Sequence, residues 1–257
     1  RWPAHWQGPV AEARQLLRMQ QPAPALDLLM QAAQRFPQLP RVHLELADAM
    51  RLESRNDAAL AANARTLALS PGWNRAVRLQ VELLGQDARR WPQAEQVLQQ
   101  AVGSRDGWND ADLIGLLAWV QERQERDPDA LAAARRSLLQ DPQQAWVWSL
   151  VRRVCERAET PDVLDTLIDD VVRSRPGDAE AWLVRAEHGR DDEAALAAAE
   201  QAVTLQPRHL AAWHARLQRL VRLGRFEQAE QLLATLPWPN EAPLSLRAWG
   251  PQCRWHQ

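Results

Sequence analysis

The chain has 257 residues, of which 46% are hydrophobic, and its formal net charge at pH 7 is -2. This apolar content argues against a disordered chain, and the near-neutral charge gives no general attraction to nucleic acid or to an anionic membrane. All 31 basic residues are arginine. No stretch approaches the roughly 18 apolar residues of a membrane span. We therefore expect a folded protein that binds no nucleic acid and inserts into no membrane.

Cysteine usage and the start of the chain bear on its location. Two cysteines, Cys155 and Cys253, are too few for a disulfide framework. The sequence opens on Arg1 without a methionine and carries no signal peptide. We expect a cytoplasmic protein that is a fragment or a processed product. A processed secreted or periplasmic form is the alternative.

A small residue recurs along the chain at a spacing of about 34 residues. The positions are Ala25, Ala59, Ala94, Ala130, Leu164 in place of an alanine, Ala195 and Ala229. Most of the same repeats end at a proline, namely Pro37, Pro71, Pro142, Pro176 and Pro207. Such a period predicts a stack of small units, each of which buries its apolar face against its neighbours.

Each repeat is expected to contain two helices. In the second repeat, Val42, Leu46 and Met50 place apolar groups on one helical face. A polar break at residues 54–57 follows, and a second helix then begins that contains Ala59. A methyl group at the alanine position lets the two helices cross closely, because a larger side chain would force them apart.

The seventh repeat has the clearest motif. Trp213 is followed by the turn Leu223-Gly224-Arg225-Phe226 and then by Ala229. This pattern closely resembles the tetratricopeptide repeat, and Trp148 and Trp182 occupy the same early position as Trp213. The resemblance covers about residues 9–241 and implies an all-α, right-handed α-solenoid of about seven helix pairs, in a degenerate bacterial-type array. The sixth repeat is three residues short, between residues 186 and 195.

Three segments are expected along the chain. Residues 1–8 form a lead-in, residues 9–241 form the repeat array, and residues 242–257 form a capping helix and a tail. Leu244, Leu246 and Trp249 supply the apolar side chains of the expected cap. The physical reason is that the last repeat of a stack exposes a face that would otherwise pack on the next one.

The resemblance also implies where a partner would bind. In tetratricopeptide arrays the first helix of each repeat lines a concave face, and the positions beside the core stripe recur three or four residues apart. The candidate partner-binding residues on that face are Arg41, Asp48, Arg51, Arg75, Arg78, Glu82, Trp119, Trp146, Arg153 and His214, with Leu44 projected beside them. Arginine and tryptophan are common interface hot spots. The alternative is a solvated helix face of alternating charge.

Catalytic and cofactor sites have no support in the sequence. No histidine stands at a zinc-like spacing from other ligands, and glycine-rich phosphate loops and nucleophile elbows are lacking. One tetratricopeptide subtype holds a partner's C-terminal carboxylate with lysine and asparagine. This chain has no lysine, so we expect no such clamp. We predict a protein that is not an enzyme and that has no catalytic, cofactor or metal residues.

The function expected from these observations is a non-catalytic scaffold that binds a protein or peptide in the concave face. The alternative is a recognition or regulatory arm of a larger enzyme, for example a glycosyltransferase or a sulfotransferase, whose catalytic domain lies outside this sequence. A homodimer formed through the ends of the array or the tail is a third reading.

Overall fold

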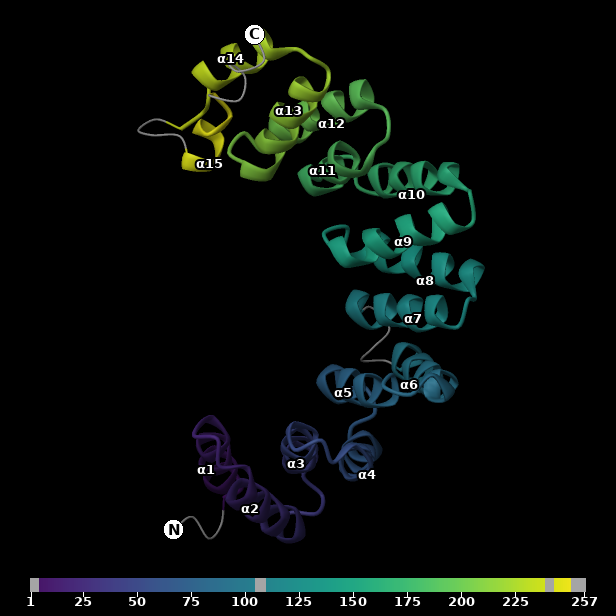
Figure 1. Ribbon diagram of the computed structural model, residues 1–257, viewed down its shortest axis with the longest axis vertical. Helices are drawn as coiled ribbons and strands as arrows, with labels where there is room; N and C mark the ends of the chain where they lie inside the picture. Colours follow the sequence, from purple (N-terminus) through teal and green to yellow (C-terminus); the bar gives the residue numbers. More distant parts are fainter. Residues whose placement is uncertain (1–4, 105–109, 239–242, 251–257) are drawn as a thin grey trace. The chain divides into compact units, whose positions relative to one another are not determined.

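A computed structural model describes residues 5–104, 110–238 and 243–250 of the chain. Within these ranges every regular element is a helix and no strand occurs (Figure 1). Seven helix pairs follow one another along the chain, so the prediction of an all-α array of about seven pairs is confirmed. The chain forms two compact units, the N-terminal unit of residues 1–134 and the C-terminal unit of residues 135–257.

The N-terminal unit contains three complete pairs, the first helix of the fourth pair and the start of its second. Its elements are α1 (Gln7–Arg18), α2 (Pro22–Arg35), α3 (Pro40–Leu52), α4 (Asn56–Leu69), α5 (Asn74–Leu84), the 3-10 turn η1 (Ala88–Arg90), α6 (Trp91–Gly103), α7 (Ala111–Arg123) and α8 (Asp127–Gln140). The boundary between the two units falls within α8. Odd-numbered helices are the first helices of their pairs and even-numbered helices are the second.

The C-terminal unit contains three complete pairs and a short helix after them. Its elements are α9 (Ala145–Arg157), α10 (Pro161–Ser174), α11 (Ala179–His188), α12 (Asp192–Leu205), α13 (Leu210–Arg222), α14 (Phe226–Ala234) and α15 (Leu244–Arg247). Several of these helices begin at a side-chain cap. Asp191, for example, accepts a hydrogen bond from the backbone amide of Glu193 at 2.9 Å, which satisfies one of the unpaired donors at a helix start.

The turn inside most pairs needs one residue with left-handed backbone geometry. Gly224 takes this position in the seventh pair with φ of 72°. Gln20, Ser54, Glu125 and Glu159 take it in the first, second, fourth and fifth pairs, with φ between 54° and 59°. Glycine has no Cβ to clash there, which is the physical reason for a glycine in the turn motif of the seventh repeat.

The recurring small residue lies at the centre of each pair, as the sequence predicted. All six alanines of the series are completely buried, and Leu164, which replaces the seventh, is 6% exposed. Each one belongs to the second helix of its pair. In the six pairs that carry alanine, a larger side chain at this buried position would need the surrounding atoms to move apart.

A second recurring contact links each early aromatic to the preceding proline turn. The indole Nε1 of the tryptophan donates to the proline carbonyl six residues earlier in three repeats, at 2.9 Å for Trp148–Pro142 and at 2.8 Å for Trp182–Pro176 and Trp213–Pro207. In the second repeat His43 Nε2 stands in for the indole, 3.0 Å from the carbonyl oxygen of Pro37. The aromatic therefore fixes the start of the first helix to the turn before it.

The segment after the last pair returns to that pair. Leu246 of α15 is completely buried and belongs to the same apolar cluster as Trp213, Leu217 and Leu220 of α13. Leu244 at the start of α15 points the other way and is 76% exposed. The helix starts 34 residues after α13, which is one repeat step. The segment thus covers part of the face on which a further repeat would pack.

Enlarging the alanine at the centre of a pair should destabilise the fold. We expect Ala59→Leu to lower the free energy of unfolding by about 1–3 kcal/mol, because the added atoms have no space between the helices. Urea denaturation followed by circular dichroism measures the change. The control is Ala61→Leu on the exposed side of the same helix. Equal stability of the two variants would contradict the packing described here.

Removing the segment after the seventh pair tests the proposed capping role. Deletion of residues 242–257 should lower the melting temperature and promote aggregation, because the apolar face under Leu246 becomes exposed. Thermal melting and light scattering report the two effects. A shorter deletion of residues 251–257, which leaves α15 in place, is the matched control. If the variant lacking residues 242–257 is as stable and soluble as the parent, the capping role is contradicted, and the segment is better described as a linker.

Candidate functional site

The first helices of the N-terminal unit share a network of ion pairs centred on Glu45 of α3. Its side chain is 7% exposed and accepts from Arg14 of α1, whose Nε lies 2.9 Å from Oε2. Arg41 Nε lies 3.0 Å and Arg75 Nη1 lies 3.2 Å from Oε1 of the same carboxylate. One buried carboxylate therefore joins α1, α3 and α5.

The network continues between α3 and α5. Asp48 pairs with Arg75 of α5 and with Arg51 of its own helix. Arg51 Nη1 lies 3.2 Å from Oε1 of Glu82, which links α3 to α5 a second time. A separate ion pair, with Arg78 Nη2 2.5 Å from Oδ2 of Asp112, links α5 to α7. The partners on successive first helices are 27 to 34 positions apart, which is close to one repeat step.

All six charged candidates of the N-terminal unit have a partner of opposite charge within the chain. They are Arg41, Asp48, Arg51, Arg75, Arg78 and Glu82. Five of them belong to the network around Glu45, whereas Arg78 pairs separately with Asp112.

The projection from helical spacing was wrong at one position of α3. Leu44 was placed beside the core stripe, but it is completely buried. The next residue, Glu45, has the central role in the network, and the sequence analysis did not single it out. A signal was present, since Arg14 and Arg75 stand 31 and 30 residues from Glu45, close to one repeat step.

The surrounding arginines determine the charge state of Glu45. Burial opposes ionisation of this carboxyl group, but the hydrogen bond from Arg14 and the charges of Arg14, Arg75 and Arg41 favour it. The balance holds the pKa of Glu45 below its ordinary value. Glu45 is therefore ionised at neutral pH, and its negative charge is paired with the three arginines around it.

Trp119 of α7, a candidate partner-binding residue, also packs against the core. Its ring is partly buried and packs edge-on against Trp91 at the start of α6, with centroids 5.1 Å apart and planes at 85°. An edge-to-face pair of this kind stabilises the contact between α6 and α7, which belong to successive pairs, by about 0.5–1.5 kcal/mol beyond area burial. Trp119 thus has a structural role whether or not a partner also contacts it.

The remaining candidates lie in the C-terminal unit. Trp146 on α9 is 39% exposed, and Arg153 on the same helix is exposed. His214 on α13 has both ring nitrogens engaged: Nδ1 accepts from the indole of Trp249 at 3.0 Å, and Nε2 lies 3.1 Å from the hydroxyl of Ser245. Burial lowers the pKa of His214, in keeping with a neutral ring. A partner could reach these nitrogens only by displacing the C-terminal segment.

Two adjacent hollows open among the first helices α9, α11 and α13. The larger, which we call the arginine hollow, has a volume of about 490 Å³ and is lined by Arg152, Arg190, Arg219 and Arg222 among others. The smaller, the glutamate hollow, has a volume of about 280 Å³ and is lined by Glu180, Glu187 and Trp148 among others. Glu187 and His188 line both hollows. None of the four arginines of the arginine hollow and neither Glu180 nor Glu187 of the glutamate hollow was expected from the sequence to contact a partner, whereas helical projection had placed Glu156, which also lines the arginine hollow, on the binding face.

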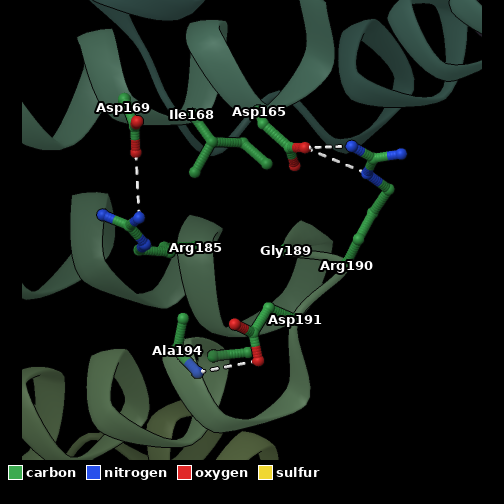
Figure 2. A pocket seen from close by; sticks show the side chains of 9 residues that line it. Asp165, Ile168, Asp169, Arg185, Gly189, Arg190, Asp191 and Ala194 are labelled. Atoms are coloured by element: carbon green, nitrogen blue, oxygen red, sulfur yellow. Dashed lines mark hydrogen bonds and ion pairs between the residues drawn. The ribbon is translucent and has the colours of Figure 1, made fainter. Parts of the chain in front are cut away.

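A third hollow of about 400 Å³ lies between α10, α11 and α12, and Figure 2 shows the charged side chains that line it. Arg185 Nη2 is 3.0 Å from Oδ1 of Asp169, and Arg190 donates to Asp165. Asp191 accepts from the backbone amide of Ala194 at 3.4 Å. Each of these charges is satisfied within the chain, so the hollow offers no unpaired group to a ligand.

Metal and membrane sites are the remaining possibilities. In the described part of the chain, no three histidine, cysteine or acidic side chains gather as a metal site would require. None of the described helices combines the length and the apolar character that crossing a bilayer requires.

Comparison with known proteins rests on structure alone. No protein-family model matches the sequence, and no curated protein does. Solved structures do match. A tetratricopeptide repeat protein from Parabacteroides merdae covers 97% of this chain and 98% of its own, with 10% identity and a TM-score of 0.55. PilF of Pseudomonas aeruginosa covers 83% of this chain and 97% of its own, with 16% identity and a TM-score of 0.53.

This chain has the tetratricopeptide-repeat fold. The APC/C hetero-tetramer Cut9–Hcn1 also matches, over 86% of this chain, with 16% identity and a TM-score of 0.50, although the match spans only 43% of that longer chain. Identities this low establish the fold and leave the ligand open.

Loss of the Glu45 charge should change how the stability of this tetratricopeptide array depends on pH. We expect Glu45→Gln to lower the free energy of unfolding by about 1–3 kcal/mol at neutral pH, because three arginines lose their shared partner. The folded pKa of Glu45 lies below its ordinary value of 4.5. The contribution is therefore complete above that value and is lost as the pH falls through the folded pKa.

Urea denaturation at a series of pH values between neutral and acidic measures this effect. The stability difference between the parent and Glu45→Gln should shrink as the pH falls. Glu53→Gln, at an exposed position just after α3, is the control and should show no such convergence. A stability difference that stays constant over the whole pH range would contradict the role given to Glu45.

Proposed function

We propose that this protein is a non-catalytic scaffold that binds a peptide or a protein segment on the exposed faces of its first helices. The observation that carries the proposal is the pair of hollows between α9, α11 and α13. Both hollows lie on the first helices. They contain two charged groups, Arg152 and Glu187, that form no ion pair within the described part of the chain. Concave sites with a few polar groups are the usual form of a binding site.

The charge network of the N-terminal unit has a different place in this proposal. Arg41, Asp48, Arg51, Arg75, Arg78 and Glu82 are proposed to line the binding face, but their charges already pair within the chain. The pairs Arg51–Glu82 and Arg78–Asp112 are exposed to water, and exposed ion pairs contribute little to stability, so a partner can exchange with these two pairs at small cost. We propose that these residues orient a charged partner while the hollows provide the specific contacts.

Trp146 and Arg153 of α9 complete the proposed surface in the C-terminal unit. The indole of Trp146 is 39% exposed, which is unusual for a large apolar side chain. Aromatic and arginine side chains of this kind are typical of interface hot spots. Trp119 and His214 stay in the proposal as secondary contacts, since Trp91 and the C-terminal segment already hold them.

Peptide selection tests the proposal. A random peptide library displayed on phage is selected against the immobilised chain, and the enriched peptides are synthesised for affinity measurement. We expect Trp146→Ala or Arg153→Ala to weaken their binding by about 1–2 kcal/mol, with the circular dichroism spectrum unchanged. The control is Arg173→Ala, on the exposed side of the second helix α10.

Two results would contradict the scaffold proposal. One is a selection that enriches no binding peptide. The other is a set of peptides whose affinity falls with Arg173→Ala but not with the two α9 variants, which would move the site to the second helices. Light scattering of the free chain shows separately whether the surface is used for self-association.

A further inference from the structure

The arginine hollow exists because one helix is a turn short. α11 has 10 residues, whereas the first helices on either side of it, α9 and α13, have 13 each. Three residues correspond to about 4.5 Å of helix. The same shortfall is visible in the sequence as the missing residues of the sixth repeat. The last turns of α9 and α13 therefore extend past the end of α11.

Gly189 and Arg219 make this early ending possible. A Cβ on Gly189 would lie 2.6 Å from the carbonyl oxygen of Arg185, so a larger residue cannot leave the helix here by the same path. The side chain of Arg219 is 4% exposed and donates to the carbonyl oxygens of Ala186 and Glu187 at 2.8 and 3.0 Å. Arg219 thus satisfies carbonyl groups that the missing turn would have bonded.

The arginine hollow contains one arginine that the chain does not pair with a carboxylate. Arg190 pairs with Asp165, and Arg219 pairs with Asp192. Arg152 instead donates to Nδ1 of His188 at 2.9 Å, and no carboxylate of the described residues forms an ion pair with it. The three glutamates that line the hollow, Glu156, Glu159 and Glu187, therefore leave the Arg152 guanidinium without a direct partner of opposite charge.

His188 lies next to Arg152. Its ring stacks on Trp148 with centroids 5.2 Å apart and planes at 24°. Burial, followed by the charges of Arg152 and Arg219, lowers the pKa of His188 to about 4. The ring is therefore neutral near pH 7 and accepts the hydrogen bond from Arg152. It offers Arg152 no negative charge, so the guanidinium keeps its full attraction for an anion.

The glutamate hollow has the opposite charge. Glu180 accepts a hydrogen bond from Nε2 of His209 at 2.7 Å, whereas no basic residue among those described pairs with Glu187. Partial burial and the neighbouring charge of Glu180 raise the pKa of Glu187. A carboxylate in this position gains from a cation, because a charge-assisted hydrogen bond would satisfy it.

We propose that the two hollows together bind a peptide segment that carries an acidic and a basic side chain close to each other. The carboxylate enters the arginine hollow and meets Arg152, and the cationic group enters the glutamate hollow and meets Glu187. Glu187 and His188 line both hollows, so the two hollows adjoin and the two side chains of the peptide must lie close together. The inference rests on the proposed peptide-binding function and adds the chemistry of the peptide. Opposite charges at fixed positions give such a site its selectivity.

Synthetic peptides test the charge pattern directly. The probes are short glycine peptides, acetylated and amidated at their ends, that carry Glu and Arg, Glu and Gln, Gln and Arg, or Gln at both positions. Both orders of the two side chains are used. Chemical-shift titration of the indole N–H of Trp148 measures the dissociation constants. We expect the peptides with Glu and Arg to bind at least about ten-fold more tightly than those with Gln at both positions.

Variants of the chain assign each charge to its hollow. With Arg152→Gln the preference for Glu over Gln should disappear, while the preference for Arg over Gln remains. With Glu187→Gln the reverse is expected. Arg173→Gln, on the exposed side of α10, is the matched control and should change neither preference. An otherwise neutral peptide with a free C-terminal carboxylate shows whether a chain end can replace the acidic side chain.

The outcomes separate this inference from the scaffold proposal. If all probes bind alike, or if neither variant changes the charge preference, the inference is overturned. Library peptides that bind the parent and both variants equally would overturn it too, yet would leave the scaffold proposal standing. If neither the library nor the probes yield binding, both proposals fall.

Discussion

The close crossing of the two helices in each pair is the constraint on which the rest of the structure depends. At each crossing a completely buried alanine, or Leu164 in one pair, separates the two backbones. The separation must be nearly the same in every pair, because each pair packs on the next. Equal separation then aligns the equivalent turns of neighbouring first helices, so that residues one repeat apart lie next to each other. The ion pairs between residues about one repeat apart, such as those of Glu45, are a consequence of this register.

The two halves of the chain use their charges differently. In the N-terminal unit the arginines and carboxylates of the first helices neutralise one another, and the result is a polar surface with few unsatisfied groups. In the C-terminal unit the register is interrupted at α11, so Arg152 has a neutral histidine as its neighbour and Glu187 has no cation. A surface whose charged groups are already paired with one another offers few unpaired groups that could select a ligand. The interruption of the pattern is therefore the more informative part of the molecule for function.

Much of the fold could be predicted from the sequence, because packing in a repeat stack is local. The alanine series, the early tryptophans and the glycine of the seventh turn each reflect a contact made within one repeat. The site was harder to predict. Helical projection placed Leu44 on the binding face, although Leu44 is buried and the neighbouring Glu45 has that position. The spacing within one helix also could not show that the Trp119 ring packs against Trp91 of another helix. The hollows depend on side chains from α9, α11 and α13 at once, and spacing within one repeat carries no information about such an arrangement. The three missing residues of the sixth repeat were the available signal.

The short α11 also bears on how repeat proteins diversify. A deletion inside a globular domain usually disturbs a core to which many segments contribute. In a stack of repeats the loss of one helical turn leaves the alanine contact of that pair intact, with Ala195 still completely buried, and the next pair resumes the common spacing. A recognition site can thus arise by removal of residues, with no new element added. Variation in repeat length, as much as variation in surface residues, is then a route by which related arrays acquire different ligands.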